Sequence, residues 1–473
     1  MAMQLPAYLV GDEMRGSSEL EVFYPWDGSL SGTCAMIDRD TLETTIDAMT
    51  APGLELPTRF ERHDVLRKAA SLLLERADEF ADTIRLESGL CRRENQYEVG
   101  RTRDVLEFAA MEALRDDGQV FSCDISPQGK ARKIFTFRQP VALAAAVTPF
   151  NHPLNQVAHK VAPAIAAGAP LLLKPSEKTP LTALKFTALL YEAGLPPWML
   201  STFVGSIDDV VTPMITHPKV DAVSFTGSVE IGKHIAKTVG YRKLCLELGG
   251  NSPLIILDDA DLELAVKLAS EGSFRNSGQR CTAVKRILVQ RGIHDRFCDA
   301  FVESAKSYRA GDPADPETRV GTVIDEEAAK TLESRVQGAV SDGAQVLLGG
   351  TRRGALMEPT VLRDVRRESE IVAKESFGPL APIVPIEDLD DAIDYYNGGP
   401  FGLSSAICTR DLNLAMNAAK RLRCGTTNIN EVPGYRLEST PFGGVRDSGL
   451  GVKEGVVESM NFLATVKTFS LPW

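Results

Sequence analysis

The chain has 473 residues, of which 44% are hydrophobic and 25% are charged, and its formal net charge is −12. A chain of this length can bury more than one core, so we expect more than one domain. The acidic balance argues against nucleic acid as the main partner. The longest apolar run, VALAAAV at 141–147, is far shorter than the roughly 20 residues of a membrane span, so no membrane partner is expected.

Compartment and metal content are predicted from the termini and from the cysteine and histidine pattern. The stretch MAMQLPAYLVGDEMRG at 1–16 has no basic region followed by an apolar block, which argues against a signal peptide. The eight cysteines are scattered without a CxxC pair, which favours a reducing compartment, so we expect a cytoplasmic protein. The six histidines form neither HExxH nor a Cys/His pair with ligand spacing, so no metal site is predicted.

The first segment, to about Gly118, is expected to be helical. Apolar residues recur at spacings of three and four over 62–89, where the pattern ends at Gly89, and again over 96–114. After this segment, short apolar runs alternate with helical stretches, which is typical of parallel sheets covered by helices. We expect two such series, one with strands at 141–148, 170–174, 201–205, 221–227 and 243–250, and one with strands at 252–257, 286–290, 381–386, 403–409 and 424–430.

This rhythm predicts an α/β protein with two open, doubly wound parallel-sheet domains and the active cleft between them. The segments 131–140 and 463–473 alternate like exposed strands that need a partner. A neighbouring subunit could pair with them, because exposed sheet edges are usually paired or covered.

The stretch NSGQRCTAVKR, at 276–286, sets Cys281 among small and polar residues. An arbitrary cysteine is more often a small buried hydrophobe. Here the neighbours are not typical of a core, and both the adjacent Arg280 and an expected helix N-terminus would favour the thiolate that attacks a carbonyl.

Two further residues lie at expected strand ends. Glu247, in ELGGNSP, could take a proton from water if partial burial raises its pKa; the alternative is a salt bridge or a helix cap. Asn151, in TPFNHP, could donate to an oxyanion; the alternative is a turn residue before His152. The stretch SFTGSVEIG at 224–232 reads as a strand, a glycine turn and a helix start, which would leave N–H groups at Gly227 and Ser228 facing a phosphate.

The motifs TPFN, KPSEKTP, FTGS, ELGGNSP, GQRC, ESFGP and PFGG together resemble those of the NAD(P)-dependent aldehyde dehydrogenase superfamily in order and approximate spacing. The resemblance covers nearly the whole chain. It implies that Cys281 is the nucleophile, that Glu247 is the base that activates water, and that Asn151 holds the oxyanion together with the N–H of Cys281. A carboxylate at Glu247 favours the hydrolytic branch over relatives that pass the acyl group to coenzyme A.

The resemblance also assigns cofactor residues. Lys174 and Glu177 resemble the pair that holds the adenosine ribose. Glu177 can accept from a free 2′-hydroxyl but would repel a 2′-phosphate, so NAD is favoured and NADP is the second choice. The remaining cofactor positions implied are Thr148, Phe150, Ser176, Gly227, Ser228, Leu248, Glu375 and Phe377.

The domain boundaries follow from the same resemblance. An NAD-binding domain is expected over 1–120 and 141–246, a catalytic domain over 247–440, and an oligomerisation arm over 121–140 and 455–473. The arm implies a homo-oligomer, either a dimer or a tetramer.

The channel to Cys281 is expected to carry cationic and donor groups, which favours a small anionic aldehyde as substrate. Each of these residues has an alternative: Arg101 could be solvated, His159 could belong to the core, and Arg436 could pair with Glu438. The predicted channel residues are Arg101, His152, His159, Arg280 and Arg436.

The stretches FNHPLNQVAHKVAPAIA, GQRCTAVKR, NEVPGYR and KTFSLPW look like those of the phosphonate-catabolism aldehyde dehydrogenases, so phosphonoacetaldehyde is the first expected substrate. Non-phosphorylating glyceraldehyde-3-phosphate dehydrogenases, which prefer NADP, are the runner-up, and lactaldehyde and succinate-semialdehyde dehydrogenases are further possibilities. A non-catalytic relative would be expected to have lost Cys281, Glu247 or Asn151, and all three are present.

Overall fold

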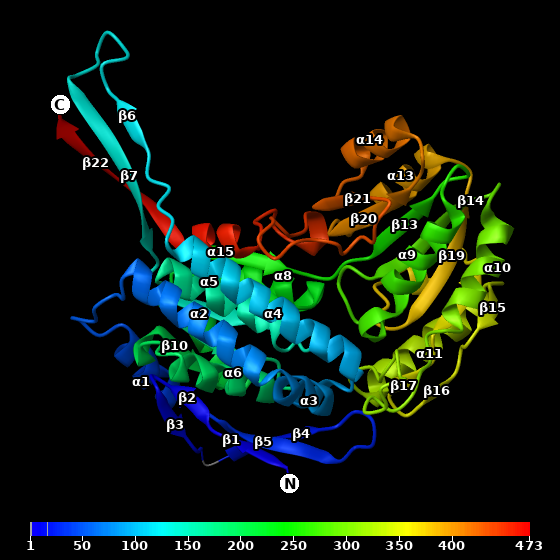
Figure 1. The fold of residues 1–473 in the computed structure, drawn as a ribbon, viewed down its shortest axis with the longest axis horizontal. Helices are drawn as coiled ribbons and strands as arrows, with labels where there is room; N and C mark the ends of the chain where they lie inside the picture. The colour runs from blue at the N-terminus through cyan, green and yellow to red at the C-terminus, as the bar shows by residue number, and fades with distance from the viewer. Residues whose placement is uncertain (1, 17) are drawn as a thin grey trace.

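The computed structural model describes residues 2–16 and 18–473, and two seven-stranded sheets dominate it (Figure 1). The first sheet has the order β12-β11-β8-β9-β10-β2-β3. Its strands from β12 to β10 are parallel, and the β2–β3 hairpin adds an antiparallel edge. The strands are β2 (Ala7–Leu9), β3 (Asp12–Met14), β8 (Ala144–Val147), β9 (Leu171–Lys174), β10 (Leu200–Thr202), β11 (Ala222–Thr226) and β12 (Lys243–Glu247).

Helices cover both faces of the first sheet, because successive residues of a strand point to opposite sides. Leu171 and Leu173 pack into the core beneath one helical layer, whereas Leu172 packs into the core beneath the other. The first layer contains α2 (Arg59–Glu75), α3 (Ala77–Ser88), α4 (Arg92–Ala113), α5 (Asn155–Ala167) and α6 (Leu181–Glu192). The second contains α1 (Arg39–Met49), the π-helical turn η2 (Ile207–Val211), α7 (Thr212–Thr216) and α8 (Val229–Thr238).

The second sheet has the order β15-β18-β19-β14-β13-β20-β21 and is parallel except for β15. Its strands are β13 (Ser252–Ile256), β14 (Val284–Gln290), β15 (Gln345–Leu348), β18 (Thr360–Arg363), β19 (Leu380–Ile386), β20 (Ser404–Cys408) and β21 (Thr426–Ile429). One face packs against α9 (Leu262–Phe274) and α10 (His294–Ala305). The other packs against α11 (Glu326–Ser341), α12 (Glu370–Ala373), α13 (Leu389–Gly398) and α14 (Leu412–Arg421). A small hairpin joins β16 (Arg352–Arg353) to β17 (Leu356–Met357).

After β21 the chain returns to the end of the first sheet. Glu247 and Gly449 form an isolated antiparallel bridge, and the Leu248 N–H donates to the Ser448 carbonyl at 3.1 Å. The helix α15 (Val456–Phe462) then packs on α5. This return path, which includes the short 3-10 helix η4 (Arg446–Ser448), brings residues 443–449 against the carboxyl end of β12.

A three-stranded antiparallel arm, of order β22-β7-β6, projects away from the rest of the molecule at the upper left of Figure 1. It consists of β6 (Val120–Ser122), β7 (Arg132–Pro140) and β22 (Ala464–Pro472). The β22 strand pairs with β7 along its whole length, from Ala464 opposite Pro140 to Pro472 opposite Arg132. The two segments that alternate in the sequence are therefore strands that pair with each other.

The expectation of a helical first segment was wrong for its first part. Residues before α1 form short strands, including a three-stranded sheet of β1 (Met3–Leu5), β5 (Leu30–Met36) and β4 (Ser18–Phe23). These strands bury few side chains of their own, among them Val22 and Cys34, so no clear period marks them in the sequence. The helical stretch 62–89 is two helices, α2 and α3, and the second ends at Gly89 with a φ of 70°.

Within the described residues, no helix is long and apolar enough to cross a membrane. The same residues contain no cluster of three or more histidine, cysteine or acidic side chains arranged to hold a metal ion.

We predict that the arm builds a homo-oligomer. In the described part of the chain the outer edge of β22 has no strand partner, and Val466, Phe469 and Leu471 are exposed on it. Deleting residues 464–473 should therefore reduce the particle mass measured by light scattering to a smaller assembly. An intact protein that is already monomeric, or a truncated protein with unchanged mass, would contradict this assignment.

Candidate active site

Two cavities meet at Cys281. One, of about 700 Å³, opens between α4, the start of α5 and the segment after β21. The other, of about 500 Å³, lies over the carboxyl ends of β8, β11 and β12. Cys281, Asn151 and Gln156 line both. A group bound in the second cavity can therefore face a small molecule bound in the first across the sulfur atom.

Cys281 lies in a turn between the 3-10 helix η3 (Arg275–Gly278) and β14, not at a helix N-terminus as expected. Asn276, Ser277 and Gly278 all have positive φ, between 51° and 68°. Such a conformation costs about 1–3 kcal/mol at a non-glycine residue and persists only where the surroundings enforce it. Here the Ser277 hydroxyl donates to the Gly321 carbonyl at 3.0 Å.

Gln279 ties the same turn to the segment before α11. Its side-chain oxygen accepts from the Ile324 N–H at 2.9 Å, and its Nε2 donates to the Thr322 carbonyl at 3.4 Å. Because these partners lie more than forty residues further along the chain, tertiary structure rather than local propensity holds the turn that carries Cys281.

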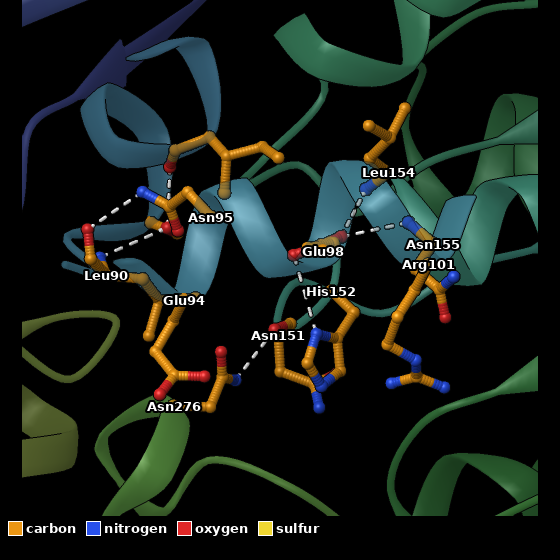
Figure 2. A network of polar contacts seen from close by, with 12 residues as sticks. Leu90, Glu94, Asn95, Glu98, Arg101, Asn151, His152, Leu154, Asn155 and Asn276 are labelled. Carbon is orange, nitrogen blue, oxygen red and sulfur yellow. Dashed lines mark hydrogen bonds and ion pairs between the residues drawn. The ribbon is translucent and has the colours of Figure 1, made fainter. Parts of the chain in front are cut away.

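Asn151 follows β8 and reaches across to the Cys281 turn. Its Nδ2 donates to the Gln279 carbonyl at 2.8 Å. Asn276 Nδ2 donates back to the Asn151 carbonyl at 3.0 Å (Figure 2). The amide of Asn151 carries two N–H groups, so one remains for an oxygen atom beside Cys281. The oxyanion role of Asn151 stays a prediction.

Glu98 of α4 fixes the loop that carries Asn151 (Figure 2). Its Oε1 accepts from the backbone N–H groups of Leu154 and Asn155 at 2.8 and 2.9 Å, and its Oε2 lies 3.4 Å from Nδ1 of His152. The start of α5 lacks a cap from its own N-cap residue, so Glu98 satisfies N–H groups that would otherwise be buried without a partner. This role escaped prediction because its partners are more than fifty residues away.

The thiol of Cys281 is not activated in the way the sequence suggested. Burial raises its pKa to about 11, and the carboxylates of Glu375 and Glu247 act in the same direction. Arg436 and Lys285 oppose the rise. The guanidinium of Arg280 is engaged by backbone groups: its Nη2 donates to the Glu271 and Gly272 carbonyls at 3.0 and 2.7 Å.

Glu247 ends β12 and lies almost fully buried beside Cys281. Neither of its carboxyl oxygens has a hydrogen-bond partner among the described residues, so it is neither a cap nor half of a close ion pair. Burial raises its pKa to about 8, although Lys160, Arg436 and Lys453 pull in the opposite direction. A carboxyl group with this pKa can exchange a proton near neutral pH.

The second cavity fits a dinucleotide. The Thr148 and Thr226 hydroxyls line it and have no partner among the described residues, which leaves two buried donors for a ligand. At Gly227, a Cβ would lie 2.5 Å from the Phe225 ring, so a side chain there would crowd the cavity wall. The cavity is lined by every predicted cofactor residue: Thr148, Phe150, Lys174, Ser176, Glu177, Gly227, Ser228, Leu248, Glu375 and Phe377.

Two details of this cavity differ from expectation. The Gly227 N–H donates to the Glu247 carbonyl at 3.1 Å and so is not free for a phosphate, because parallel pairing of β11 with β12 extends to the turn. Lys174 and Glu177 form an ion pair, in which the lysine is buried and the carboxylate is about half exposed.

Lys285 is a buried cation that sequence reasoning left without a role. Its Nζ donates to the Ser376 carbonyl at 2.8 Å, lies 3.8 Å from Oε1 of Glu375, and sits over the Phe377 ring at 4.5 Å. Burial lowers its pKa to about 8. A lysine within an apolar strand thus orders the segment that carries the two predicted nicotinamide-side residues.

The first cavity brings together four of the five predicted channel residues: Arg101, His152, Arg280 and Arg436. His159 is the exception, because it is fully buried on α5 and does not line the cavity. Its Nε2 lies 2.6 Å from Oε2 of Glu438. Burial and the charge of Arg436 lower its pKa to about 4, so it is a neutral core histidine, the alternative noted above.

Comparison with known proteins identifies the family. The model of the aldehyde dehydrogenase family matches residues 13–469. The chain is 36% identical over 452 residues to the 3-sulfolactaldehyde dehydrogenase of Priestia aryabhattai, covering 96% of this chain and 94% of that protein. It is 35% identical over 457 residues to the sulfoacetaldehyde dehydrogenase of Neptuniibacter caesariensis, covering 96% and 99%.

Solved structures agree with the family model. The NADP-dependent glyceraldehyde-3-phosphate dehydrogenase of Bacillus halodurans C-125, complexed with NADP, superposes with a TM-score of 0.95 at 30% identity and covers 99% of both chains. The predicted fold, with two open parallel-sheet domains of the aldehyde dehydrogenase type, is confirmed.

We predict that Gly278→Ala abolishes most turnover. A Cβ at this position would lie 2.0 Å from the Gly378 carbonyl oxygen, and the φ of 68° is unfavourable for alanine. The turn carrying Cys281 would have to move, so we expect at least a tenfold loss of kcat. A displacement of about 1 Å of a catalytic group can lower the rate about 10²-fold.

Gly338→Ala is the matched control for this substitution. Gly338 lies in α11, and a Cβ at this position would have no neighbouring atom within 4 Å. Alanine there should therefore leave kcat unchanged and slightly raise the melting temperature. Equal activity of the Gly278→Ala and Gly338→Ala proteins would contradict the constraint on the turn.

Proposed function

The chain belongs to the aldehyde dehydrogenase family, and we propose that it oxidises a small anionic aldehyde to the corresponding acid with NAD as the hydride acceptor. Membership makes the chain an NAD(P)-dependent aldehyde dehydrogenase. The substrate class, the preference for NAD and the roles of individual residues are the proposal.

In this proposal Cys281 is the nucleophile. Its thiol first loses its proton to solvent. The thiolate sulfur then adds to the aldehyde carbon, and the oxygen that takes up the carbonyl electron pair and becomes negative receives hydrogen bonds from the free N–H of the Asn151 amide and from the backbone N–H of Cys281. The residues that line the second cavity would hold NAD, which would supply the acceptor for the hydride that leaves the same carbon. The product of that step is a thioester on Cys281.

Glu247 completes the reaction by hydrolysis. The carboxylate takes a proton from a water molecule, the water oxygen attacks the thioester carbon, and the acid leaves as the Cys281 sulfur is released. Support comes from the position of Glu247, which lines the second cavity together with Cys281 and has two carboxyl oxygens without protein partners.

An unpartnered guanidinium nitrogen carries the substrate assignment. Arg436 lines the first cavity together with Cys281, its side chain is about nine-tenths buried, and its Nη1 has no hydrogen-bond partner among the described residues. A buried donor of this kind is costly unless a ligand satisfies it, and an anion satisfies it best. Arg101 and Arg280 line the same cavity.

Phosphonoacetaldehyde, favoured by the sequence motifs, and sulfoacetaldehyde, favoured by the name of a relative, are the leading candidates. Both are two-carbon aldehydes with a tetrahedral anion whose oxygens match guanidinium donors. Glyceraldehyde-3-phosphate is the second candidate, supported by the superposed structure. Glu177 supports NAD over NADP, because its half-exposed carboxylate lines the cofactor cavity and would repel a 2′-phosphate.

We predict that steady turnover rises with pH through about 8. Glu247 accepts a proton only when it is ionised, and its pKa of about 8 leaves it mostly protonated at pH 7.

Glu247→Gln should lower steady turnover about 10²–10⁴-fold while a stopped-flow burst of NADH, one per active site, persists. Steady turnover close to that of the wild-type protein, with the same pH profile, would remove Glu247 as the base.

We also predict that Arg436→Gln raises KM for anionic aldehydes by about 10–100-fold, the cost of a hydrogen bond to a charged group. The KM for propanal, a neutral aldehyde, should change far less. Steady-state kinetics with both substrates gives the comparison. If propanal suffers as much as the anionic aldehyde, Arg436 supports the fold and does not bind the anion.

A further inference from the structure

We infer that Glu438 is a positioning residue that gives the enzyme its preference for anionic aldehydes, by holding Arg101 and Arg436 together on one wall of the first cavity. The inference rests on the proposed anionic substrate. It adds a carboxylate, the group that an anion-binding site would ordinarily exclude, to the residues that determine specificity.

Glu438 joins three separate parts of the chain. Its Oε1 accepts from Nε of Arg101, on α4, at 2.5 Å. Its Oε2 lies 2.6 Å from Nε2 of His159, on α5, and 3.9 Å from Nη2 of Arg436, in the segment after β21. The side chain is only 6% exposed, so these contacts form away from bulk water and are weakly screened.

The carboxylate allows two guanidinium groups to share the cavity wall. The charge of Arg101 disfavours the charged form of Arg436, so the two groups repel each other at this site. Burial alone would raise the pKa of Glu438, but the hydrogen bond with His159 and the charges of Arg101 and Arg436 hold it far below its usual range. Glu438 is therefore ionised whenever the enzyme works, and it offsets one of the two positive charges.

Glu438 also fixes the direction of each arginine. Within the described residues, Nε of Arg101 makes the only side-chain hydrogen bond of that residue to protein, and it goes to Glu438. The guanidinium of Arg436 lies 4.0 Å from the centre of the Phe442 ring, and its Nη2 faces Oε2 of Glu438 at 3.9 Å. The inner edges of both groups are thus engaged, and their outer N–H groups, including Nη1 of Arg436, remain for a substrate anion.

Two opposite results can be expected from removing this carboxylate. If Glu438 only dilutes the positive charge, Glu438→Gln makes the cavity more attractive to anions. If Glu438 positions the arginines, the same change lets the two like charges separate and lets the Arg101 side chain leave the wall, so anions bind less well. The inference commits to the second result, because Glu438 accepts the only side-chain hydrogen bond that Arg101 makes within the described residues, and the Tyr97 ring, 5.9 Å from its guanidinium, is too weak a contact to replace it.

The test compares kcat/KM for sulfoacetaldehyde and for propanal in the wild-type, Glu438→Gln and Asp104→Asn proteins. Asp104 lines the same cavity, is exposed on α4 three residues after Arg101, and takes part in no ion pair of the described residues, so its substitution removes one negative charge from the cavity without removing a contact of the arginines. The ratio of the two kcat/KM values is measured in one preparation, so incomplete folding cancels.

We expect Glu438→Gln to lower this ratio at least about tenfold, mainly through KM for the anionic aldehyde, whereas Asp104→Asn, which only removes a negative charge from the cavity, should leave the ratio unchanged or raise it. Glu438→Asp, which keeps the charge but is too short to reach both Arg101 and His159, should lower the ratio to an intermediate value. An unchanged or increased ratio in Glu438→Gln would overturn the inference.

The same data separate this inference from the proposed function. For this purpose the wild-type protein is also assayed with phosphonoacetaldehyde and glyceraldehyde-3-phosphate. If its kcat/KM for propanal equals or exceeds that for each of the three anionic aldehydes, both the proposed substrate class and the role of Glu438 are overturned. A wild-type protein that prefers an anionic aldehyde, together with a Glu438→Gln protein that keeps the preference, would overturn the role of Glu438 alone.

Discussion

The hydrogen bond from the Asn151 amide to the Gln279 carbonyl joins the two halves of the active site. Asn151 follows a strand of the first sheet, whereas Gln279 belongs to the turn that precedes a strand of the second. Neither partner is placed by its own segment alone. The turn is held in a left-handed conformation by contacts with residues 321–324, and the Asn151 loop is held by Glu98. Cys281 reaches both cavities because these two anchored segments meet.

Burial controls the chemistry of the groups placed in this way. It raises the pKa of Cys281 to about 11 and that of Glu247 to about 8, so both are mainly uncharged at neutral pH in the protein alone. The nearby cations are held by other contacts: Lys285 by backbone carbonyls and Glu375, and Arg436 by Glu438 and Phe442. Each of these cations thus already faces a carboxylate of the protein, and in the proposed function an incoming anion would meet Nη1 of Arg436, which has no partner among the described residues.

Much of this could be predicted from the sequence, because the informative features are local. Each of the ten strands expected after residue 140 exists, since a strand buried on both faces reads as a continuous apolar run. Asn151 and Glu247 follow strands of the first sheet and Cys281 precedes a strand of the second, so their meeting in the cleft between two domains could be expected. The short strands before α1 could not, because they depend on pairing more than on an apolar face of their own.

The parts that escaped prediction depend on contacts between distant residues. Glu438 lies 337 residues from Arg101 and 279 from His159 in the sequence, and only the fold brings them within hydrogen-bond distance. His159 was expected in the channel because its motif is rich in donors, but α5 turns it into the core, where Glu438 satisfies it. Arg280 stands next to the nucleophile, yet its guanidinium caps the carbonyls at the end of α9.

The most direct measurement of the central claim is NADH formation, followed by absorbance, with phosphonoacetaldehyde, sulfoacetaldehyde, glyceraldehyde-3-phosphate and propanal under identical conditions. An anion that meets the buried guanidinium of Arg436 should give at least one anionic aldehyde a kcat/KM about tenfold or more above that of propanal. Equal or faster oxidation of propanal would leave the dehydrogenase chemistry in place and contradict the assignment of the first cavity to an anionic substrate.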